Sequence, residues 1–393
     1  MTGAPLLQEP RPGPPLRVLV VISALGYGGA ETQVVELANN VDPAKLDLRV
    51  CSLSDYVPQA TRLRSPERLH IVRKRGRFDL TVVPRLAQLL RTVRTEVVHG
   101  YLFDAEIASA LAGRLAGVRA VVGSERNASY EISRIQRISY RLTRNCFDRI
   151  VANSIAGANF NRRVLGFPVD RYRVVRNGVD TARFRPMERA AARAALGLAE
   201  NIPVVGMFAS IKPQKNHLLL LQAARQIVTA LPTARFLLVG DMLNNGKAES
   251  RDYARSVQAS VDALGLRAAC QFLGNRTDLP ELYAACDLTV LPSLFEGTPN
   301  AVLESLACAC PVVVTDVSDN ALIVPDGQVG CVVPSGDHEA LSQAMLSILA
   351  APPGRRAQLA ANARSWAVRE FSLASMSANM TKVYRELVTE KIT

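Results

Sequence analysis

Short apolar runs recur along this chain in two consecutive series, and segments with helical periodicity separate each run from the next. Uninterrupted apolar runs of this kind are typical of strands buried on both faces, and strands that alternate with helices form parallel sheets. The first series of predicted strands is Leu16–Ile22, Leu46–Leu53, Glu96–His99, Ala120–Gly123 and Arg149–Ala152. The second series is Pro203–Phe208, Arg235–Val239, Cys270–Phe272, Leu288–Leu291, Val312–Thr315 and Cys331–Val333. We therefore predict an α/β protein with two facing, doubly wound, Rossmann-like domains.

The boundary between the predicted domains lies where this alternation stops. Residues from Phe184 to Asn201 are polar and rich in alanine and arginine, and a chain of 393 residues is too long for a single hydrophobic core. The predicted parts are a disordered tail at 1–15, a first domain at 16–184, a second domain at 185–371, and a C-terminal helix within 372–393 that crosses back to the first domain. Facing domains of this type leave a cleft at the carboxyl ends of their strands, where ligands bind.

Composition limits the partners and the compartment. The formal net charge of +12 favours anionic partners such as phosphates or an acidic membrane surface. Aromatic residues are few and no nucleic-acid-binding motif is present, so we expect no nucleic-acid partner. The seven cysteines lack metal-ligand spacing; Cys308 and Cys310 are predicted to be small core residues, and a reduced compartment fits. The apolar run from Leu16 to Leu25 is too short to span a bilayer and no signal peptide is recognisable, which favours a cytoplasmic protein.

The segment EGTPNAVLE, from Glu296 to Glu304, follows a predicted buried strand and opens a predicted helix. Thr298 is a favourable N-cap and Pro299 suits the first helical position. The backbone amides then predicted to point into the cleft are those of Asn300, Ala301 and Val302. Together with the helix dipole, these amides are predicted to form an anion site suited to a phosphate. The two glutamates lie on either side of it and can accept hydrogen bonds from the hydroxyl groups of a bound ligand. The alternative is an N-capped surface helix with two solvated glutamates.

Residues after two other predicted strands add candidates for contacting a phosphate. Lys215 precedes Asn216, a predicted N-cap, so its ammonium group can reach the cleft and meet a diphosphate; an ordinary surface lysine is the alternative. His217 is predicted to be structural. Gly26-Tyr27-Gly28-Gly29 is close to the dinucleotide fingerprint, but Glu31 stands where the third glycine belongs, which argues against an NAD-dependent oxidoreductase. A short glycine loop that opens a helix still allows the backbone to approach a phosphate or an acceptor closely.

In this order and spacing, the motifs resemble those of the retaining glycosyltransferases of family 4, which have the GT-B architecture of two facing Rossmann-like domains. The resemblance covers nearly the whole chain from Leu16. The residues that carry it are Gly28-Gly29-Ala30-Glu31, Asn177-Gly178-Val179-Asp180, Lys215, Glu296-Gly297-Thr298-Pro299-Asn300 through Glu304, and Asp326-Gly327-Gln328-Val329-Gly330.

The resemblance implies roles for these residues. Glu304 would hold the ribose hydroxyl groups of a nucleotide-sugar donor, Glu296 would contact the donor sugar, and Lys215 would neutralise the leaving diphosphate; Glu296 and Lys215 are thus the predicted catalytic residues. The predicted donor-binding residues are Ser210, Lys215, Gly297, Thr298, Asn300, Ala301 and Glu304. Ser210 departs from the family, which usually has an arginine there, and Lys212 is the nearby cation. Because the family commonly needs no metal ion, we expect no metal and no cofactor, with a UDP- or GDP-sugar as cosubstrate.

The candidates in the first domain for contacting the acceptor or a phosphate are Gly28, Gly29, His99, Arg126 and Asn127. The family often has a histidine at the position of His99, which lies either in the cleft or packed at the end of its strand. Arg126 and Asn127 lie where many relatives place a histidine near the transferred sugar. Since neither residue is a histidine, the sequence does not support a catalytic base in this domain.

Two groups of basic residues bear on location. One is a short cationic loop formed by Arg73, Lys74, Arg75 and Arg77. The other shares one face of a predicted helix and consists of Arg134, Arg137, Arg141 and Arg144. This face is either simply solvated or docks on anionic lipid headgroups, where each basic residue contributes about 1 kcal/mol. Docking would suit a lipid-linked acceptor and a peripheral position at the inner face of the plasma membrane.

The resulting functional prediction is a metal-independent hexosyltransferase (EC 2.4) of polysaccharide biosynthesis. It would move a sugar, with retention, from a nucleotide sugar to a glycan or lipid-linked acceptor. Three alternatives stay open: a nucleotide-sugar epimerase or hydrolase of the same architecture, an NAD-dependent oxidoreductase, and a non-catalytic basic binding protein.

Overall fold

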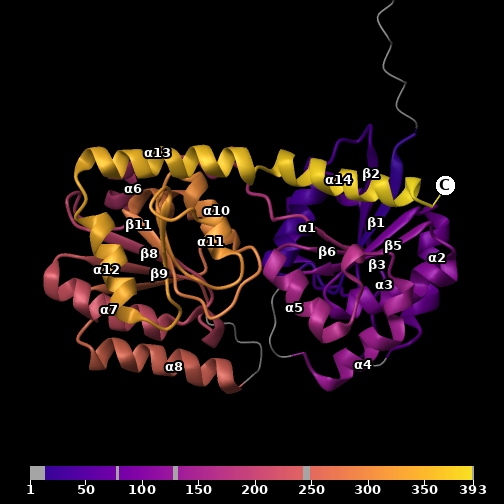
Figure 1. Ribbon diagram of the computed structural model, residues 1–393, viewed down its shortest axis with the longest axis horizontal. Helices are drawn as coiled ribbons and strands as arrows, with labels where there is room; N and C mark the ends of the chain where they lie inside the picture. Colours follow the sequence, from indigo (N-terminus) through magenta and orange to yellow (C-terminus); the bar gives the residue numbers. More distant parts are fainter. Residues whose placement is uncertain (1–13, 77–78, 127–131, 242–247, 392–393) are drawn as a thin grey trace, which may run out of the picture.

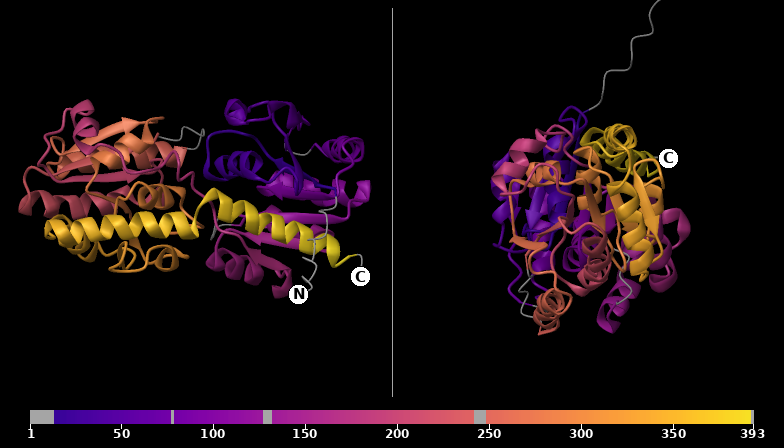
Figure 2. Two further views of the ribbon diagram at one scale, coloured as in Figure 1. Left: turned by 90° about the horizontal axis from the view of Figure 1, so that it is seen from above. Right: turned by 90° about the vertical axis from the view of Figure 1, so that its left-hand side faces the viewer.

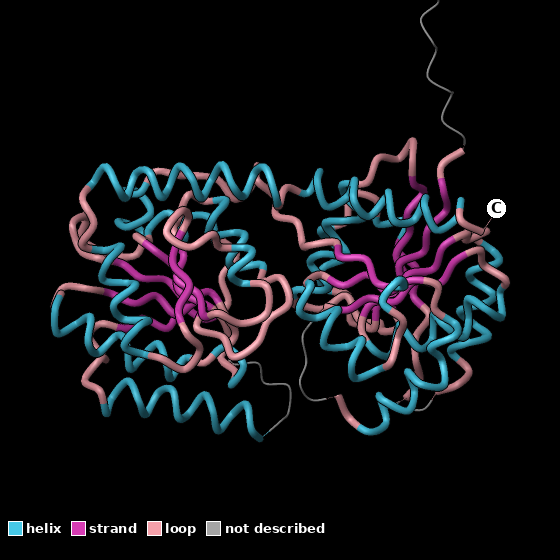
Figure 3. The backbone as a smooth tube through the Cα atoms, in the orientation of Figure 1, coloured by secondary structure: helices cyan, strands magenta, loops and turns pink. Residues whose placement is uncertain are grey.

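The computed structural model describes residues 14–76, 79–126, 132–241 and 248–391, and in these ranges it shows two α/β domains that lie side by side (Figures 1 and 2). Helices cover both faces of each sheet (Figure 3). The two last helices, α13 (Pro353–Glu370) and α14 (Leu373–Thr389), follow one another along one side of the molecule and span both domains (Figure 1). Most of the predicted tail, together with Arg77 and Asn127, lies outside the described residues.

The first domain contains seven parallel strands within the described residues, in the order β3-β2-β1-β4-β5-β6-β7. Their bounds are β1 (Leu16–Ile22), β2 (Leu46–Ser52), β3 (Leu69–Ile71), β4 (Val97–Tyr101), β5 (Ala120–Glu125), β6 (Arg149–Ala152) and β7 (Tyr172–Val174). The helices are α1 (Gly29–Asn40), α2 (Val82–Thr92), α3 (Phe103–Ala116), α4 (Arg134–Thr143) and α5 (Ile155–Leu165). The sequence prediction missed β3 and β7, which are three-residue edge strands without a long apolar run.

In the described part of the second domain, six parallel strands follow the order β10-β9-β8-β11-β12-β13. Their bounds are β8 (Val204–Phe208), β9 (Arg235–Val239), β10 (Cys270–Gly274), β11 (Leu288–Leu291), β12 (Val312–Thr315) and β13 (Gly330–Val333). The helices other than α13 are α6 (Arg189–Ala195), α7 (His217–Ala230), α8 (Ala248–Ala263), α9 (Leu279–Ala285), α10 (Asn300–Ala307), α11 (Asn320–Ile323) and α12 (His338–Leu349). The predicted α/β class with doubly wound parallel sheets is confirmed.

Apolar side chains fill the space between each sheet and its helices. The central strands are buried along their whole length, as β4, β8 and β12 show, because helices cover both faces of each sheet. Cys308 and Cys310 belong to the core of the second domain, as predicted. All seven cysteines lie in the described part of the chain, and none of them forms a disulfide.

Helix α14 packs against the first domain, although it follows the second in sequence (Figure 2). Its side chains Leu373, Met380 and Leu387 are buried in the core of the first domain. A Cβ at Gly178 would lie 3.0 Å from the Leu373 and Met376 side chains, so the chain crossing between the domains passes close to the start of this helix. The helix therefore ties the end of the chain to the first domain.

The strand order reverses once in each sheet. The strand β1 lies between β2 and β4, and β8 lies between β9 and β11. In open α/β sheets, ligands bind at the carboxyl ends of the strands at this switch point, because the loops on its two sides diverge and leave a crevice. The loops that follow β1, β4, β8 and β11 are therefore the places to look for a site.

Candidate active site

A pocket of about 400 Å³ lies between the domains, where these loops meet. The first domain contributes Gly29, Ala30, Glu31, Leu102, Arg126, Asn153 and Asn177. The second contributes Phe208, Ala209, Lys212, Gln214, Lys215 and the segment from Glu296 to Ala301. Since almost every lining residue follows a strand, the pocket is the switch-point crevice of both sheets. We name it the transfer pocket after the reaction that the family resemblance predicts.

Glu296 and Lys215, the two predicted catalytic residues, meet in the transfer pocket. The Lys215 ammonium group forms an ion pair with Oε1 of Glu296, which also accepts a hydrogen bond of 2.7 Å from the Ser293 hydroxyl. The Glu296 side chain is only 6% exposed and is thus held in one place. Lys212 lines the same pocket, and its pKa is lowered by burial and by the nearby charge of Lys215. The charged residues that line this pocket are Arg126, Lys212 and Lys215 against Glu31 and Glu296, which leaves a small excess of positive charge for an anionic ligand.

The start of α10 differs from the prediction. The residue before the helix is Pro299, it has no side-chain capping bond, and the first helical residue is Asn300, so Thr298 is not the N-cap. The Thr298 hydroxyl instead donates to the backbone oxygen of Asn153 in the other domain. The amide of Val302 already donates to Pro299 O at 3.1 Å. Within the described residues, the helix start therefore offers the amides of Asn300 and its successor, rather than the three amides predicted.

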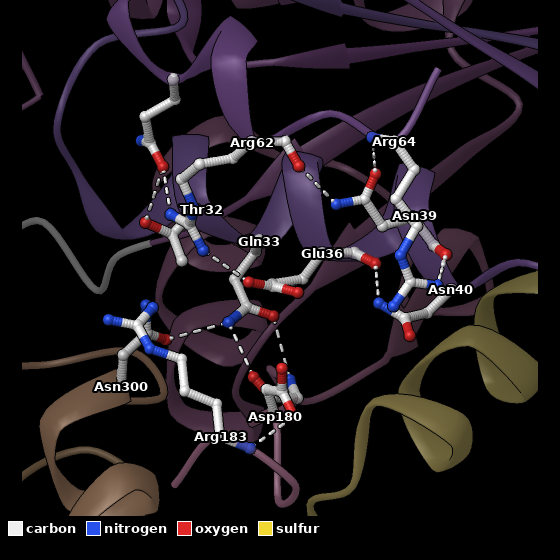
Figure 4. A network of polar contacts seen from close by, with 12 residues as sticks. Thr32, Gln33, Glu36, Asn39, Asn40, Arg62, Arg64, Asp180, Arg183 and Asn300 are labelled. Carbon is white, nitrogen blue, oxygen red and sulfur yellow. Dashed lines mark hydrogen bonds and ion pairs between the residues drawn. The ribbon is translucent and has the colours of Figure 1, made fainter. Parts of the chain in front are cut away.

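Glu304 lies in a second pocket of about 410 Å³, which we name the ribose pocket after the group that the family resemblance predicts beside Glu304. Its Oε2 accepts a hydrogen bond of 3.0 Å from the Tyr283 hydroxyl. Burial raises the pKa of Glu304, and the Tyr283 hydrogen bond opposes this in part. The charged residues that line the pocket with it are Glu36, Arg62, Asp180, Arg183 and Arg276. Figure 4 shows that Glu36 and Arg62 reach this space from the first domain, whereas Asp180 and Arg183 follow the crossing between the domains.

The two pockets share Gly29 and Asn300, so the start of α1 and the start of α10 separate them. Asn300 Oδ1 accepts a hydrogen bond from Gln33 Nε2 at 3.3 Å (Figure 4). It also accepts one from Asn177 Nδ2 at 2.8 Å. Gln33 also exchanges two hydrogen bonds of 2.9 Å with the backbone of Gly178. These contacts bring Glu296 and Glu304 to opposite sides of one helix start.

The structure separates the candidates of the first domain. Gly29 lies in both pockets, and Gly28 lines the ribose pocket and precedes α1. Arg126 lines the transfer pocket, with its guanidinium group 4.3 Å from the centre of the Tyr101 ring. Asn127 lies outside the described residues.

His99 is packed and does not face the cleft. It lies inside β4 rather than at its end, is fully buried, and its Nδ1 is 2.7 Å from the hydroxyl of Tyr384 on α14. Burial, together with the charge of Arg126, lowers the pKa of His99 well below its usual range. His99 therefore packs beneath the C-terminal helix and lines neither pocket, which agrees with the packed alternative.

Ser210 does not line either pocket, whereas Lys212 two residues later lines the transfer pocket. The chain turns after β8 into a short 3₁₀ helix, Pro213–Lys215, which brings both lysines to the same side. His217 is buried at the start of α7, and its pKa is lowered to about 4 by burial and by Lys215, in keeping with the predicted structural role. Lys212 is thus the cation near Ser210 that reaches the transfer pocket.

Several residues of the site were missed. Gln33, Asn153 and Asn177 hold the two domains together around the start of α10, and Glu36 and Arg62 line the ribose pocket. Asn177 belongs to a motif that the sequence analysis had singled out, so its position after the last strand of the first domain was a usable signal. The others are ordinary polar residues, and only their contacts across the cleft distinguish them.

Two family models match the chain one after the other. The model described as Glycosyltransferase Family 4 matches residues 27–183, and the model described as Glycosyl transferases group 1 matches residues 188–366. The chain belongs to this family of group 1/family 4 glycosyltransferases with the GT-B fold. The predicted family is thereby confirmed, and the oxidoreductase alternative finds no support.

Curated relatives agree with this assignment. A D-inositol 3-phosphate glycosyltransferase of Rhodococcus jostii is 35% identical over 242 residues, which are 61% of this chain and 52% of the relative. An Escherichia coli UDP-Gal:alpha-D-GlcNAc-diphosphoundecaprenol alpha-1,3-galactosyltransferase is 27% identical over 69% of this chain and 70% of its own. The matched region thus spans about half the length of the inositol phosphate enzyme.

Solved structures share the fold. Anabaena Alr3699/HepE in complex with UDP superposes with a TM-score of 0.82 over 94% of this chain and 100% of its own, at 21% identity. WaaG, a glycosyltransferase involved in lipopolysaccharide biosynthesis, superposes with a TM-score of 0.69 over 93% and 99%, at 18% identity. Among the described helices, none is long and apolar enough to cross a membrane. In the described ranges no cluster of three or more histidine, cysteine or acidic residues is arranged to hold a metal ion.

Proposed function

We propose that the protein transfers a sugar from a nucleotide sugar to a glycan or lipid-linked acceptor. The observation that carries this proposal is the pair of adjoining pockets. One contains Glu296 with two lysines, the other contains Glu304, and the start of α10 lies between them. In a nucleoside diphosphate sugar, the sugar, the anionic diphosphate and the ribose with its base follow one another in the same order.

The donor would bind with its diphosphate at the shared boundary of the two pockets. There the amides at the start of α10 and the ammonium groups of Lys212 and Lys215 stabilise negative charge. Glu304 would accept hydrogen bonds from the ribose hydroxyl groups, and Glu296 from a hydroxyl group of the sugar. Because Lys215 already contacts Glu296, it would lie between the sugar and the phosphates.

The chemical step follows from this placement. The bond between the anomeric carbon and the diphosphate oxygen breaks, and its electron pair stays on the diphosphate. Positive charge then develops on the sugar and negative charge on the leaving group, where fixed cations and amides lower the barrier. The acceptor hydroxyl oxygen forms the new bond on the same face of the sugar, and its proton passes to the departing phosphate oxygen. Retention and metal independence are parts of this proposal, and activity that survives chelation would support the latter.

The Escherichia coli galactosyltransferase, which this chain matches over 70% of the length of that enzyme, supports a proposal for the donor and the acceptor. Its name describes transfer of galactose from UDP-galactose to a sugar linked through diphosphate to undecaprenol. We therefore propose a UDP-sugar, with a GDP-sugar as the second choice, and a hexose as the transferred sugar. A lipid-linked acceptor also fits the surface of α4.

The surface of α4 combines basic residues with exposed apolar ones, and we name it the α4 face. Arg134, Arg137, Arg141 and Arg144 are all exposed, and no carboxylate among the described residues pairs with them. Beside this basic stripe, Ile135, Ile138 and Leu142 are 51%, 48% and 79% exposed. A helix with exposed apolar residues next to arginines suits the headgroup region of an anionic bilayer. We propose that the α4 face binds such a bilayer from the cytoplasmic side, next to the lipid-linked acceptor.

The other basic group does not extend this face. In the cationic loop, Arg73 pairs with Asp55 at 3.2 Å and Lys74 pairs with Asp104 at 3.0 Å. Arg77 lies outside the described residues. The membrane proposal therefore rests on α4.

Calorimetric titration with UDP-, GDP-, ADP- and dTDP-sugars and with NAD tests the donor. We expect a UDP-sugar to bind, Glu304→Ala to weaken its binding by about tenfold or more because a charged hydrogen bond is lost, and Glu296→Ala to reduce mainly turnover. Glu339→Ala, which changes an acidic residue on α12 outside both pockets, is the control. Binding of NAD alone, or unchanged binding and turnover in both variants, would reject the proposal. Release or isomerisation of the sugar without an acceptor would favour the hydrolase or epimerase alternative.

Sedimentation with liposomes tests the membrane contact. The protein should sediment with vesicles of anionic phospholipid at low salt and leave them at high salt, because screening weakens the attraction. Arg137→Gln/Arg141→Gln should abolish binding. Arg255→Gln/Arg267→Gln, the same charge change at exposed sites of the second domain, should not. Absence of binding, or binding that is insensitive to salt, contradicts the idea.

A further inference from the structure

A third cavity, of about 570 Å³, lies at the end of the second sheet that is opposite to the transfer pocket. Pro203, Asp287 and Pro311 line it, and they precede β8, β11 and β12. The cavity is thus at the amino ends of these strands, whereas Lys215 and Glu296 follow their carboxyl ends. A ligand here would not touch the proposed donor site, and we name this cavity the rear pocket.

The rear pocket is built around a buried carboxylate. The Asp287 side chain is 4% exposed. Its Oδ2 accepts hydrogen bonds of 2.8 Å from Arg193 and from the amide of Val204. Its Oδ1 pairs with Arg189 and has Arg356 at 3.9 Å. Both oxygens of the carboxylate are therefore already engaged by cations or an amide.

The positive charge exceeds what Asp287 neutralises. Among the described lining residues, the charged groups are Arg189, Arg193 and Arg356 on one side and Asp287 and the exposed Glu200 on the other. Arg193 is buried, and both burial and the charge of Arg189 lower its pKa. Within the described chain, Arg189 and Arg356 have Oδ1 of Asp287 as their shared partner. Like charges held this close repel each other, and a second anion would relieve that repulsion.

Arg189 and Arg356 both line this cavity, and among the described residues Asp287 is the side chain with which their guanidinium groups pair. A guanidinium group carries five N–H donors in a planar fork that matches the oxygens of a phosphate. The side chains of Arg189 and Arg356 are 44% and 42% exposed, so they are accessible to a ligand. Arg193 instead donates hydrogen bonds to Asp287 and to the backbone oxygens of Ala285 and Ile202. Apolar residues complete the wall of the cavity: Ile202, Pro203, Pro311, Ile348, Leu349 and Pro353.

We propose that the rear pocket binds a phosphomonoester, separately from the nucleotide sugar. The phosphate bridges the guanidinium groups of Arg189 and Arg356, and the organic part lies against the apolar wall. The Arg193–Asp287 pair underneath holds the floor of the site and makes no contact with the ligand. Arg356 lies in the first turn of α13, the helix that leads into α14 on the first domain, so a bound phosphate would contact the segment that joins the domains.

Calorimetric titration of the full chain with inorganic phosphate and with phenyl phosphate tests this. Both probes should bind, and phenyl phosphate should bind more tightly because its ring covers the apolar wall. Arg189→Gln/Arg356→Gln should weaken both probes by about tenfold or more, because two charged hydrogen bonds are lost. This variant leaves the buried Arg193–Asp287 pair in place, so we expect it to fold.

Two control variants separate the rear pocket from other anion sites. Arg255→Gln/Arg267→Gln removes the same charge from exposed positions of the same domain and should leave binding unchanged. Lys215→Met removes a cation of the transfer pocket and should also leave phenyl phosphate binding unchanged. The proposal is overturned if the Arg189/Arg356 variant binds as the unmodified protein does, if either control loses binding equally, or if phenyl phosphate does not bind at millimolar concentration. None of these outcomes depends on whether the protein transfers sugar.

Discussion

Replacement of Gly297 by alanine should open the cleft without unfolding either domain. Gly297 follows Glu296 and lies against the other domain. A Cβ at this position would be 2.5 Å from Asn153 Oδ1 and 2.8 Å from the backbone oxygen of Arg126. Non-bonded carbon and oxygen atoms do not approach this closely, so one of the two sides must move.

Neither of the two groups that the added Cβ would meet can easily move away. Arg126 O is a backbone atom, and Asn153 is 3% exposed with its Nδ2 donating to that same oxygen at 3.2 Å. The φ of Gly297 is outside the left-handed region, so alanine can adopt its backbone conformation. The strain therefore arises from space across the interface and acts on the closed arrangement of the domains.

Overpacking of this kind typically costs about 1–3 kcal/mol, which corresponds to a factor of about 5 to 150 in the ratio of the closed to the open form. The apparent Kd of a ligand that contacts both domains should rise by up to the same factor. The unfolding temperature of each domain should change little, because the added methyl group lies between the domains and not inside a core.

Gly354 provides the matched control. It lies in the first turn of α13, and a Cβ there would have no neighbouring atom within 4 Å. Small-angle scattering of the ligand-free protein should show a larger radius of gyration for Gly297→Ala and no change for Gly354→Ala, and calorimetry with a UDP-sugar should show the loss of affinity. Identical scattering and affinity for Gly297→Ala and the unmodified protein would refute this reasoning, as would an equal effect of Gly354→Ala.

Three further predictions concern buried polar groups. Burial raises the pKa of Glu106 from 4.5 to about 7, so the unfolding free energy of the unmodified protein should fall as the pH rises through this window. Glu106→Gln removes this dependence, so its unfolding free energy relative to the unmodified protein should increase by up to about 3 kcal/mol between pH 4.5 and 7 in urea titrations. A difference that stays constant with pH would contradict this. Arg193→Met should lower the unfolding free energy by about 3–5 kcal/mol in the same assay because it leaves the Asp287 carboxylate buried with fewer partners, whereas a loss below about 1 kcal/mol would show that the pair is dispensable. Tyr384→Phe should cost about 1–3 kcal/mol because His99 Nδ1 loses its partner, with the exposed Tyr56→Phe as control; equal stability of the two variants would show that this hydrogen bond contributes nothing.

The secondary structure of this chain was largely predictable because its central strands are buried on both faces. Leu16–Ile22, Arg235–Val239 and Leu288–Leu291 have the predicted bounds, and each is an almost uninterrupted apolar run. The edge strands β3 and β7 escaped prediction because a three-residue strand that pairs on one side needs no apolar run. An apolar run in the sequence therefore predicts central strands well, because they are buried on two faces, and predicts edge strands poorly.

The candidate site was predictable in part, for a related reason. Lys215 and Glu296 follow β8 and β11, which are neighbours in the sheet, so the order of strands alone brings them together. The prediction of Thr298 as an N-cap failed because its hydroxyl group bonds to Asn153, which is far away in sequence. Gly297 was predicted only as a donor-binding residue, whereas the structure shows that a larger side chain there would collide with Asn153 and Arg126 of the other domain.

The sequence by itself determined the two α/β domains, the family and the segments that carry the site, because strand burial and the residues after each strand are local properties. Only the tertiary structure decided which of those residues meet. It placed His99 beneath α14, Lys212 rather than Ser210 in the transfer pocket, and Glu304 in a pocket of its own. These outcomes depend on how two domains and a C-terminal helix close on one another. Such contacts join residues that are hundreds of positions apart, and no local pattern records them.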